Sequence, residues 1–594
     1  MRKRLIISIL LILITPILVI LSDYEEIKSH ITALTNEKMK GRKAGTEGEK
    51  YAAEYISTKF KQYGLLPTFG DNFYQNFEFI SGVQAGSNNN FKIIYIEEGK
   101  SIEKSLIYEK DFLPLAISKS ASIKGTLVFA GYGITAPELN YDDYSGLDID
   151  NKIAIVLMHY PKEKDEKNPF KISQNLNYGD IQYKIYNANN HKAAAIILIN
   201  DFANHQQHED ELIQLKEFTL YDSSSIPAIH LKRHSIIPFL EKINFNIAEA
   251  EKKIEENMKP QYKILSDLGA EISVDLIKKK SIATNVSGMI KGKSNTYILI
   301  GAHYDHLGEV EIQKDNELGY YPGADDNASG VSALLYLTNK FTRDATYNNS
   351  IIFTAFSAEE IGVQGSNYFI NSQAIPTNSI KAMINMDMIG RLKDSLIIGG
   401  SETAEEFKTL INQLNNNNLS IKYSADGYGP SDHSVFYNKN IPVLFFFTGA
   451  HTDHHTTKDI AEKINIDGIQ KVADFIYTIV KNIEKDDVKL TFHRVKESKP
   501  LEISRRGIKT YLGTIPDFAY DGEGVKISGV RKGSPASIAG LMEGDIIIQL
   551  GDKKISNLND YTFALRSYNP NDNVKIKFIR NREEKETEAT LGKR

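Results

Sequence analysis

The sequence predicts an α/β fold for the larger part of its 594 residues. Short apolar runs, YILIGA (297–302), IIFTAF (351–356) and AMINM (382–386), have the length and composition of buried strands. Each run is followed at once, or within a few residues, by His303, by Glu359 with Glu360, or by Asp387. Because an open α/β sheet builds its sites where its strands end, these runs predict both the fold and the place of a site.

The chain opens with MRKR, an apolar run at 5–21 and the acidic stretch SDYEE. A basic start followed by an apolar run is typical of an export signal. The 17-residue run is longer than most signal segments and short for a membrane span, and no clear small-residue cleavage site follows it. We therefore expect residues 1–22 to be a signal peptide or an N-terminal membrane anchor. The domains after them are expected outside the cytoplasm, in the periplasm, in the medium or attached to the membrane.

An amphipathic helix is predicted near the start of the first domain, after the Gly-rich stretch MKGRKAGTEG (39–48). Its apolar stripe consists of Ala52, Ala53, Tyr55, Ile56 and Phe60. Residues 23–109 are assigned to the first part of this domain, which resumes at 271 and ends at 490. Between them, residues 110–270 alternate strands with turn residues, and YKIYNANNHKAAAIILIND (183–201) indicates a helix and then a buried strand.

Five segments carry residues of the kind that bind a divalent metal. They are GAHYDHLG (301–308), PGADDNASG (322–330), SAEEIGVQGS (357–366), NMDMIG (385–390) and HTDHHTTKD (451–459). The chain has no Cys, so a zinc site must be made of imidazoles and carboxylates. Two zinc ions about 3.5 to 4 Å apart need a bridging carboxylate and terminal ligands, roughly two His and three acids. The segments supply that set, and Asp305 is placed to orient the imidazole of His303.

With these five motifs in order, the chain resembles the dinuclear zinc aminopeptidase family, which also contains glutamate carboxypeptidase and the glutaminyl cyclases. The resemblance covers nearly all of the chain and implies a mixed sheet flanked by helices. It implies that His303 and Asp387 bind one zinc and that Glu360 and His455 bind the other. Asp326, two residues before the AS of ASG, takes the bridging position, and the peptide bond after this Asp is often cis in the family.

The resemblance also implies two catalytic positions. Glu359 takes the place of the catalytic base. His454 stands where the family commonly has a Tyr whose hydroxyl helps to hold the oxyanion of the tetrahedral intermediate. An imidazole N–H can donate in the same way, but its donation depends on tautomer and protonation, so we expect a different pH dependence from that of Tyr-containing relatives.

Three other histidines are interpreted as ordinary hydrogen-bonded or solvated residues: His306, His433 and His451. Asp432 and His433, in GPSDHSVFYNKNIPV, match a family loop near the cleft.

Two further domains are suggested by resemblance. AGYGITAPELNYDDYSGLD (130–148) resembles the bacterial form of the protease-associated insert, and residues 110–270 are assigned to that mainly β domain. Residues 505–594 resemble a PDZ domain, with YLGTIPDF (511–518) as its carboxylate-binding loop. A PDZ groove binds an extended C-terminal peptide at a sheet edge, but this domain could equally serve only to pack on the catalytic domain.

The sequence therefore predicts a zinc-dependent exopeptidase, with two Zn²⁺ per chain, that removes N-terminal residues from peptides. A carboxypeptidase or a glutaminyl cyclase of the same family stays open as an alternative, although a cyclase normally keeps one zinc. A non-enzymatic binding protein on the same fold is a third alternative, but it would be expected to have lost ligands. The formal net charge of −5 is small for this length and gives no electrostatic support to a nucleic-acid partner.

Overall fold

The computed structural model describes residues 23–594 except 166, 173–177, 206–209, 216–223, 311–317, 345, 417–418, 426, 486, 496–509, 518–519, 521, 532 and 594. The signal or anchor predicted at 1–22 lies outside the described residues. Among the helices in the described part of the chain, none is long and apolar enough to cross a membrane.

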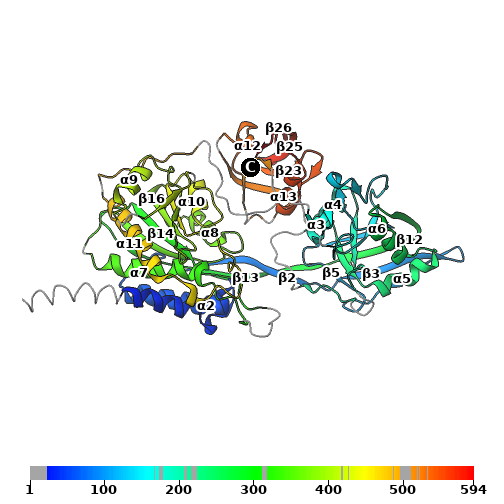
Figure 1. The fold of residues 1–594 in the computed structure, drawn as a ribbon, viewed down its shortest axis with the longest axis horizontal. Helices are drawn as coiled ribbons and strands as arrows, with labels where there is room; N and C mark the ends of the chain where they lie inside the picture. Colours follow the sequence, from blue (N-terminus) through cyan, green and yellow to red (C-terminus); the bar gives the residue numbers. More distant parts are fainter. Residues whose placement is uncertain are drawn as a thin grey trace, which may run out of the picture. The chain divides into compact units, whose positions relative to one another are not determined.

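The chain divides into two compact units (Figure 1). Of the described residues, those within 23–79 and 281–503 form unit 1, and those within 80–280 and 504–594 form unit 2. The boundaries fall inside the strands β2 (Tyr74–Ala85) and β13 (Leu276–Ile290). Residues 80–109, which the sequence analysis groups with the first domain, lie in unit 2 because β3 (Asn90–Glu97) pairs there with β12 (Tyr262–Val274).

A mixed sheet forms the centre of unit 1, as the resemblance implies. Its order is β1-β13-β15-β14-β16-β19-β17-β18, with β2 paired to β13. Four neighbours at its centre are parallel: β15 (Ser350–Phe356), β14 (Tyr297–His303), β16 (Ile380–Met386) and β19 (Val443–Phe447). The strands β13 and β17 (Leu396–Gly399) run antiparallel to their neighbours β15 and β19, while β1 (Leu66–Pro67) and β18 (Ile421–Tyr423) form the outer strands. The carboxyl ends of the four parallel strands therefore meet at one edge.

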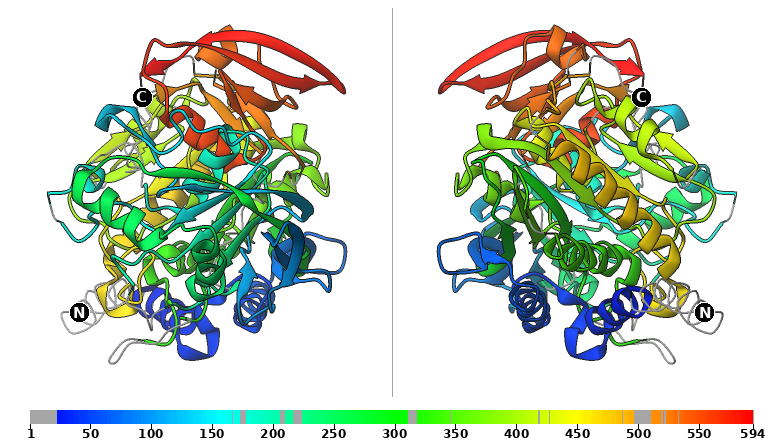
Figure 2. Two further views of the ribbon diagram at one scale, coloured as in Figure 1. Left: turned by 90° about the vertical axis from the view of Figure 1, so that its right-hand side faces the viewer. Right: turned by 90° about the vertical axis from the view of Figure 1, so that its left-hand side faces the viewer.

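Helices cover both faces of this sheet. On one face α7 (Gly330–Thr342) packs on β14, β15 and β16, and α2 (Glu47–Gln62) and α11 (Ile466–Ile483) pack against α7. The short helix α9 (Phe407–Leu414) lies beside α11, and the yellow α11 is seen in the right-hand view of Figure 2. The opposite face carries α10 (His433–Asn438) and α8 (Gln364–Asn371), so the sheet forms the middle layer of three.

The predicted amphipathic helix near the start of unit 1 is α2. Its residues Ala52, Ala53, Ile56 and Phe60 are buried and Tyr55 is half-buried. The residues just before it, Glu37–Arg42, form the short helix η1, and the side chain of Arg42 is buried. Its guanidinium donates to the carbonyl oxygens of Tyr304, Pro322 and Gly323 at 2.8, 2.7 and 3.0 Å. The N-terminal segment therefore fixes the loops that follow β14.

Unit 2 contains a second sheet, with the order β4-β3-β12-β6-β9-β10-β11-β5. Its parallel strands are β6 (Ala121–Ala130), β9 (Ile153–Leu157), β10 (Ala195–Ile199) and β11 (Ala228–Leu231). Its outer strands are β4 (Lys100–Ser105) and β5 (Phe112–Pro114), and its helices include α4 (Ile181–Asn190), α5 (Arg233–Lys242) and α6 (Ile247–Asn257). The helix and strand predicted within 183–201 are α4 and β10.

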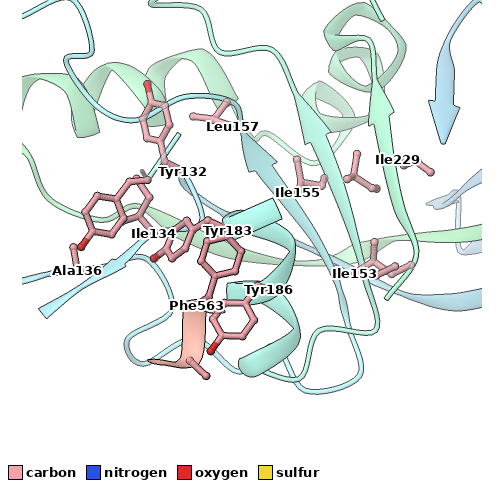
Figure 3. Close-up of a cluster of buried hydrophobic side chains, with 14 of the residues drawn as sticks. Tyr132, Ile134, Ala136, Ile153, Ile155, Leu157, Tyr183, Tyr186, Ile229 and Phe563 are labelled. Carbon is pink, nitrogen blue, oxygen red and sulfur yellow. The ribbon is translucent and has the colours of Figure 1, made fainter. Parts of the chain in front are cut away.

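The C-terminal residues form a smaller β domain in the same unit. Its sheet has the order β21-β22-β23-β25-β26, from Thr514–Pro516, Val525–Val530, Ile546–Leu550, Asn573–Arg580 and Glu583–Thr590. The helix α13 (Leu558–Arg566) packs on α4, and Figure 3 shows Phe563 beside Tyr183 and Tyr186. The ring of Phe563 lies 5.2 Å from that of Tyr186 and 6.0 Å from that of Tyr183, between ring centres. The C-terminal domain therefore shares an aromatic core with the 110–270 region.

Candidate metal centre

His303 and Asp387 come together because they end two neighbouring parallel strands. His303 is the last residue of β14, and Asp387 directly follows β16. The Nε2 atom of His303 lies 3.3 Å from Oδ1 of Asp387 and 3.3 Å from Oδ1 of Asp326. These three side chains form one group whose ligand atoms all lie within 4.8 Å of one another.

A second group of possible ligands lies on the other side of Asp326. It consists of Glu360, His455, His306 and Asp326 itself, again with all ligand atoms within 4.8 Å. Nε2 of His455 lies 3.0 Å from Oε2 of Glu360 and 3.1 Å from Oδ2 of Asp326. Nδ1 of His306 lies 2.7 Å from Oε1 of Glu360. The five residues predicted as ligands are thus all brought together, in the two sets that the resemblance implies.

Asp326 belongs to both groups and presents a different oxygen to each. Its Oδ1 faces His303 and its Oδ2 faces His455. Burial alone would raise the pKa of Asp326, but hydrogen bonds from His303, His454 and His455 hold it well below the ordinary value. The peptide bond between Asp326 and Asn327 is cis, as the resemblance implies.

Glu359 is half-buried next to the first group. Its Oε2 lies 4.0 Å from Nε2 of His303. Burial raises the pKa of the Glu359 carboxyl well above its ordinary value, and the charges of Asp387 and Glu360 raise it further against the opposing effect of His303. By contrast, hydrogen bonds from His306 and His455 overcome the effects of burial and of Asp326 and lower the pKa of Glu360 to about 2. The adjacent glutamates therefore differ in proton affinity.

His454 lies at the rim of the cluster. Its Nε2 is 3.1 Å from Oδ2 of Asp326, and its ring centre lies 3.9 Å from that of His455. The hydrogen bond to Asp326 raises the pKa of His454. The side chain is 39% exposed, so it is reachable from solvent while touching the shared carboxylate.

Several backbone positions beside these side chains are left-handed without being glycine. Ala358, Met388 and His455 have φ of 56°, 51° and 57°. Each is a predicted site residue or lies next to one. Such positions cost energy and persist where the surrounding structure imposes them, which is common at functional sites.

Sequence reasoning missed several groups that support the site. His306 was interpreted as an ordinary residue, but it is buried and belongs to the second group. Asp459 accepts the backbone N–H groups of Asp325 and Asp326 at 2.8 and 3.1 Å, and Arg391 pairs with Asp459 at 3.0 Å. Asp459 lies inside the motif HTDHHTTKD and Arg391 directly follows NMDMIG, so their place in the motifs was the available signal.

The other two histidines interpreted as ordinary differ in their surroundings. His433 is buried and stacks on Phe445, with ring centres 4.2 Å apart, and burial lowers its pKa to about 3. It is therefore a neutral core residue. His451 contacts Oδ2 of Asp325 at 3.1 Å and so lies one residue from the shared carboxylate. Burial also raises the pKa of Asp432, the residue just before His433, to about 7.

The donors of this cluster fit zinc. Imidazole nitrogens and carboxylate oxygens are the ligands zinc accepts, and neither group contains a donor of another kind. Nε2 of His306 is buried and has no hydrogen-bond partner among the described residues. Four carboxylates also lie close together here, buried or half-buried: those of Asp326, Glu359, Glu360 and Asp387. Removing their negative charge from water is costly unless cations compensate it. The two groups of candidate ligands share the carboxylate of Asp326, an arrangement that could hold two metal ions side by side.

The fold and the site thus define an α/β domain with two groups of candidate metal ligands that share an aspartate. Residues 285–480 match the model of Peptidase family M28, and residues 510–591 match that of the PDZ domain. The chain therefore carries a peptidase family M28 domain followed by a C-terminal PDZ domain, and the family resemblance seen in the sequence is confirmed.

Curated relatives match only part of the chain. A probable leucine aminopeptidase of Trichophyton verrucosum (strain HKI 0517) is 29% identical over 209 residues, which is 32% of this chain and 54% of that protein. Leucine aminopeptidase 1 of Phaeosphaeria nodorum is 28% identical over 225 residues, 34% of this chain and 57% of that protein. The chain thus spans little more than half the length of these relatives.

Among solved structures, an aminopeptidase from Aneurinibacillus sp. strain AM-1 is 23% identical, with a TM-score of 0.45, over 80% of this chain and 96% of that one. A zinc aminopeptidase from Bacillus subtilis is 19% identical, with a TM-score of 0.45, over 78% of this chain and 96% of that one.

Proposed function

We propose that this chain is a zinc-dependent aminopeptidase that removes N-terminal residues from peptides at a dinuclear centre. His303 and Asp387 would bind one Zn²⁺, Glu360 and His455 the other, and Asp326 both. The observation that carries this proposal is the position of Asp326, whose two carboxylate oxygens face the two ligand groups. A bridging carboxylate is what a two-metal hydrolytic site requires.

The chemistry follows from the residues around that carboxylate. Bound zinc would polarise the scissile carbonyl and lower the pKa of the attacking water. Glu359 would accept the proton of that water and deliver it to the leaving amine. Its position beside the first ligand group, with Oε2 4.0 Å from Nε2 of His303, supports this role. His454 is placed at the rim, where an N–H can donate to the developing oxyanion.

His306 extends this assignment beyond the five carried-over ligands. Its Nδ1 hydrogen-bonds Glu360 and lies 3.8 Å from Oδ2 of Asp326. We propose that it orients the Glu360 carboxylate toward the second ion, since a ligand carboxylate is usually held by a neighbouring hydrogen bond.

Export and the PDZ partner are part of the same proposal. The basic and apolar start of the chain supports export, with the catalytic domain outside the cytoplasm. The PDZ match supports the binding of an extended peptide or protein C-terminus at a sheet edge.

A substrate panel tests the activity. The purified protein is assayed on aminoacyl chromogenic substrates, on substrates with a free C-terminal residue and on N-terminal glutaminyl peptides, each with and without a chelator. We expect hydrolysis of the aminoacyl substrates that the chelator abolishes and added zinc restores. Cleavage confined to C-terminal residues, or cyclisation of glutaminyl peptides without hydrolysis, would overturn the aminopeptidase proposal.

A further inference from the structure

Unit 2 contains a third group of metal-ligand side chains, outside the M28 domain. It consists of His159, Asp201 and His205, whose ligand atoms lie within 4.8 Å of one another. Nδ1 of His159 lies 2.5 Å from Oδ2 of Asp201, and Nδ1 of His205 lies 3.7 Å from the same oxygen. The two imidazoles are 5.0 Å apart between ring centres. Both rings therefore turn the same type of nitrogen toward one carboxylate oxygen.

The topology of the sheet brings this group together. β9 and β10 are parallel neighbours whose last residues, Leu157 and Ile199, stand opposite each other. His159 and Asp201 each lie two residues beyond the end of their strand. The group therefore stands at the carboxyl edge of parallel strands, the part of an α/β sheet where sites are built.

Two buried charged side chains hold the turn that carries Asp201 and His205. Arg233 donates from its guanidinium to the carbonyl oxygens of Asp201 and His205, both at 3.1 Å. Glu251 accepts two backbone N–H groups inside the turn, at 2.8 and 2.7 Å. Arg233 and Glu251 are only 4% and 2% exposed. Burying two charged groups costs free energy unless they are hydrogen-bonded, and here their hydrogen bonds fix the conformation of this turn. A preorganised set of metal ligands requires such a fixed conformation.

A simple ion pair accounts for only part of this geometry. A protonated His159 would neutralise the buried Asp201 by itself. It would leave His205 unexplained, because Nδ1 of His205 is buried and has no hydrogen-bond partner within the described part of the chain. Its 3.7 Å distance from the carboxylate oxygen is too long for a hydrogen bond. An ion between the three side chains would give that nitrogen a partner.

We propose that His159, Asp201 and His205 bind a divalent transition-metal ion, with zinc as the best fit. Two imidazoles and one carboxylate are a donor set that zinc accepts, and water would complete the coordination. The ion would join the end of β9 to the turn after β10, which are 42 residues apart in the chain. It would be a separate site from the peptidase centre, with a stabilising role in unit 2.

Equilibrium dialysis of the full chain against buffered free Zn²⁺ tests this site. The metal bound per chain is compared between the wild type, His159→Ala, His205→Ala and the control His234→Ala, whose imidazole is 61% exposed and outside the group. We expect His159→Ala and His205→Ala each to bind one ion fewer than the wild type, and His234→Ala to bind as many. Hydrolysis of small aminoacyl substrates should be unchanged in all three variants.

His205→Ala decides the outcome even if His159→Ala fails to fold. The side chain of His205 is partly exposed and its Nδ1 has no hydrogen-bond partner among the described residues, so its removal should leave the fold intact. Circular dichroism and gel filtration establish that the variant is folded. If folded His205→Ala binds as much zinc as the wild type, the group is only an ion pair between His159 and Asp201, and the proposal is wrong.

Discussion

The carboxylate of Asp305 accepts the backbone N–H of Glu359, with Oδ1 of Asp305 3.1 Å from the nitrogen. Its other oxygen lies 3.4 Å from the backbone nitrogen of Glu360. From its place in the motif GAHYDHLG, this carboxylate is expected to orient the imidazole of His303. Nδ1 of His303 lies 3.3 Å from the backbone carbonyl oxygen of Asp305 and 3.8 Å from its Oδ1, so Asp305 also contacts this imidazole. Asp305 therefore ties the ends of β14 and β15 together and positions the two glutamates.

Asp305→Ala should impair the site without removing any proposed ligand. The loop with Glu359 and Glu360 would lose its anchor, and we expect a fall of about 10- to 100-fold in activity or zinc affinity, as is typical for groups that orient ligands. Asp305→Asn keeps one oxygen acceptor and should lose less. The measurement is kcat/KM together with zinc affinity. Wild-type values for Asp305→Ala would show that the loop holds its shape without this carboxylate.

Glu359→Gln and Glu360→Gln should fail in different ways although the residues are adjacent. Glu359→Gln cannot accept a proton, so zinc should be retained while the rate falls by roughly 10²- to 10⁴-fold. Glu360→Gln replaces an anionic ligand by a weak neutral one, so it should lose a zinc ion as well as activity. Metal content is measured beside turnover for both. Loss of metal in Glu359→Gln with retention in Glu360→Gln would reverse the two roles.

His433 should make unit 1 sensitive to acid. Burial lowers its pKa from 6.5 to about 3, so the unfolded chain binds a proton in this range that the folded chain does not. Stability linked to His433 is therefore complete above pH 6.5 and is lost as the pH falls toward 3, by about 2 kcal/mol between pH 6.5 and pH 5. His433→Phe keeps the stack on Phe445 and should flatten this dependence in urea unfolding. Equal slopes in variant and wild type would mean that the buried imidazole is protonated in the fold.

Phe563→Ala should destabilise unit 2 and leave the peptidase site intact. Phe563 is buried against Tyr183 and Tyr186, and truncation of a buried Phe costs about 3 to 5 kcal/mol. Every proposed catalytic residue lies in unit 1. Thermal unfolding is measured together with activity on small substrates, which checks both parts. Ile282→Ala, at a side chain in unit 1 that is 59% exposed, serves as a control. An unchanged unfolding profile would show that the aromatic contact contributes nothing.

The parts of the fold that could be predicted from sequence are those encoded locally. The strands β14, β15 and β16 were visible as apolar runs, and their ends marked His303, Glu360 and Asp387. The place of residues 80–109 was not visible, because it depends on β3 pairing with the distant β12. Pairing between strands depends on contacts far apart in the chain, which a local pattern does not contain.

The same distinction applies to the sites. The five predicted ligands lie in recognisable motifs, and the structure brings them together. His306 has no local feature that separates it from a hydrogen-bonded residue, and its role became visible only from its contact with Glu360. His159 and Asp201 lie far apart in sequence and meet only because β9 and β10 are neighbours.

The central claim, that Asp326 holds two ions, is tested most directly by the zinc content of Asp326→Ala compared with the wild type under the same dialysis conditions. The quantity compared is the number of zinc ions bound by the wild type minus the number bound by the variant. Any ion bound at His159, Asp201 and His205 in unit 2 is present in both and cancels. We expect folded Asp326→Ala to bind two zinc ions fewer per chain, and His303→Ala and His455→Ala each to bind at least one fewer. A difference of one ion or none between the wild type and Asp326→Ala would contradict a dinuclear centre bridged by this residue.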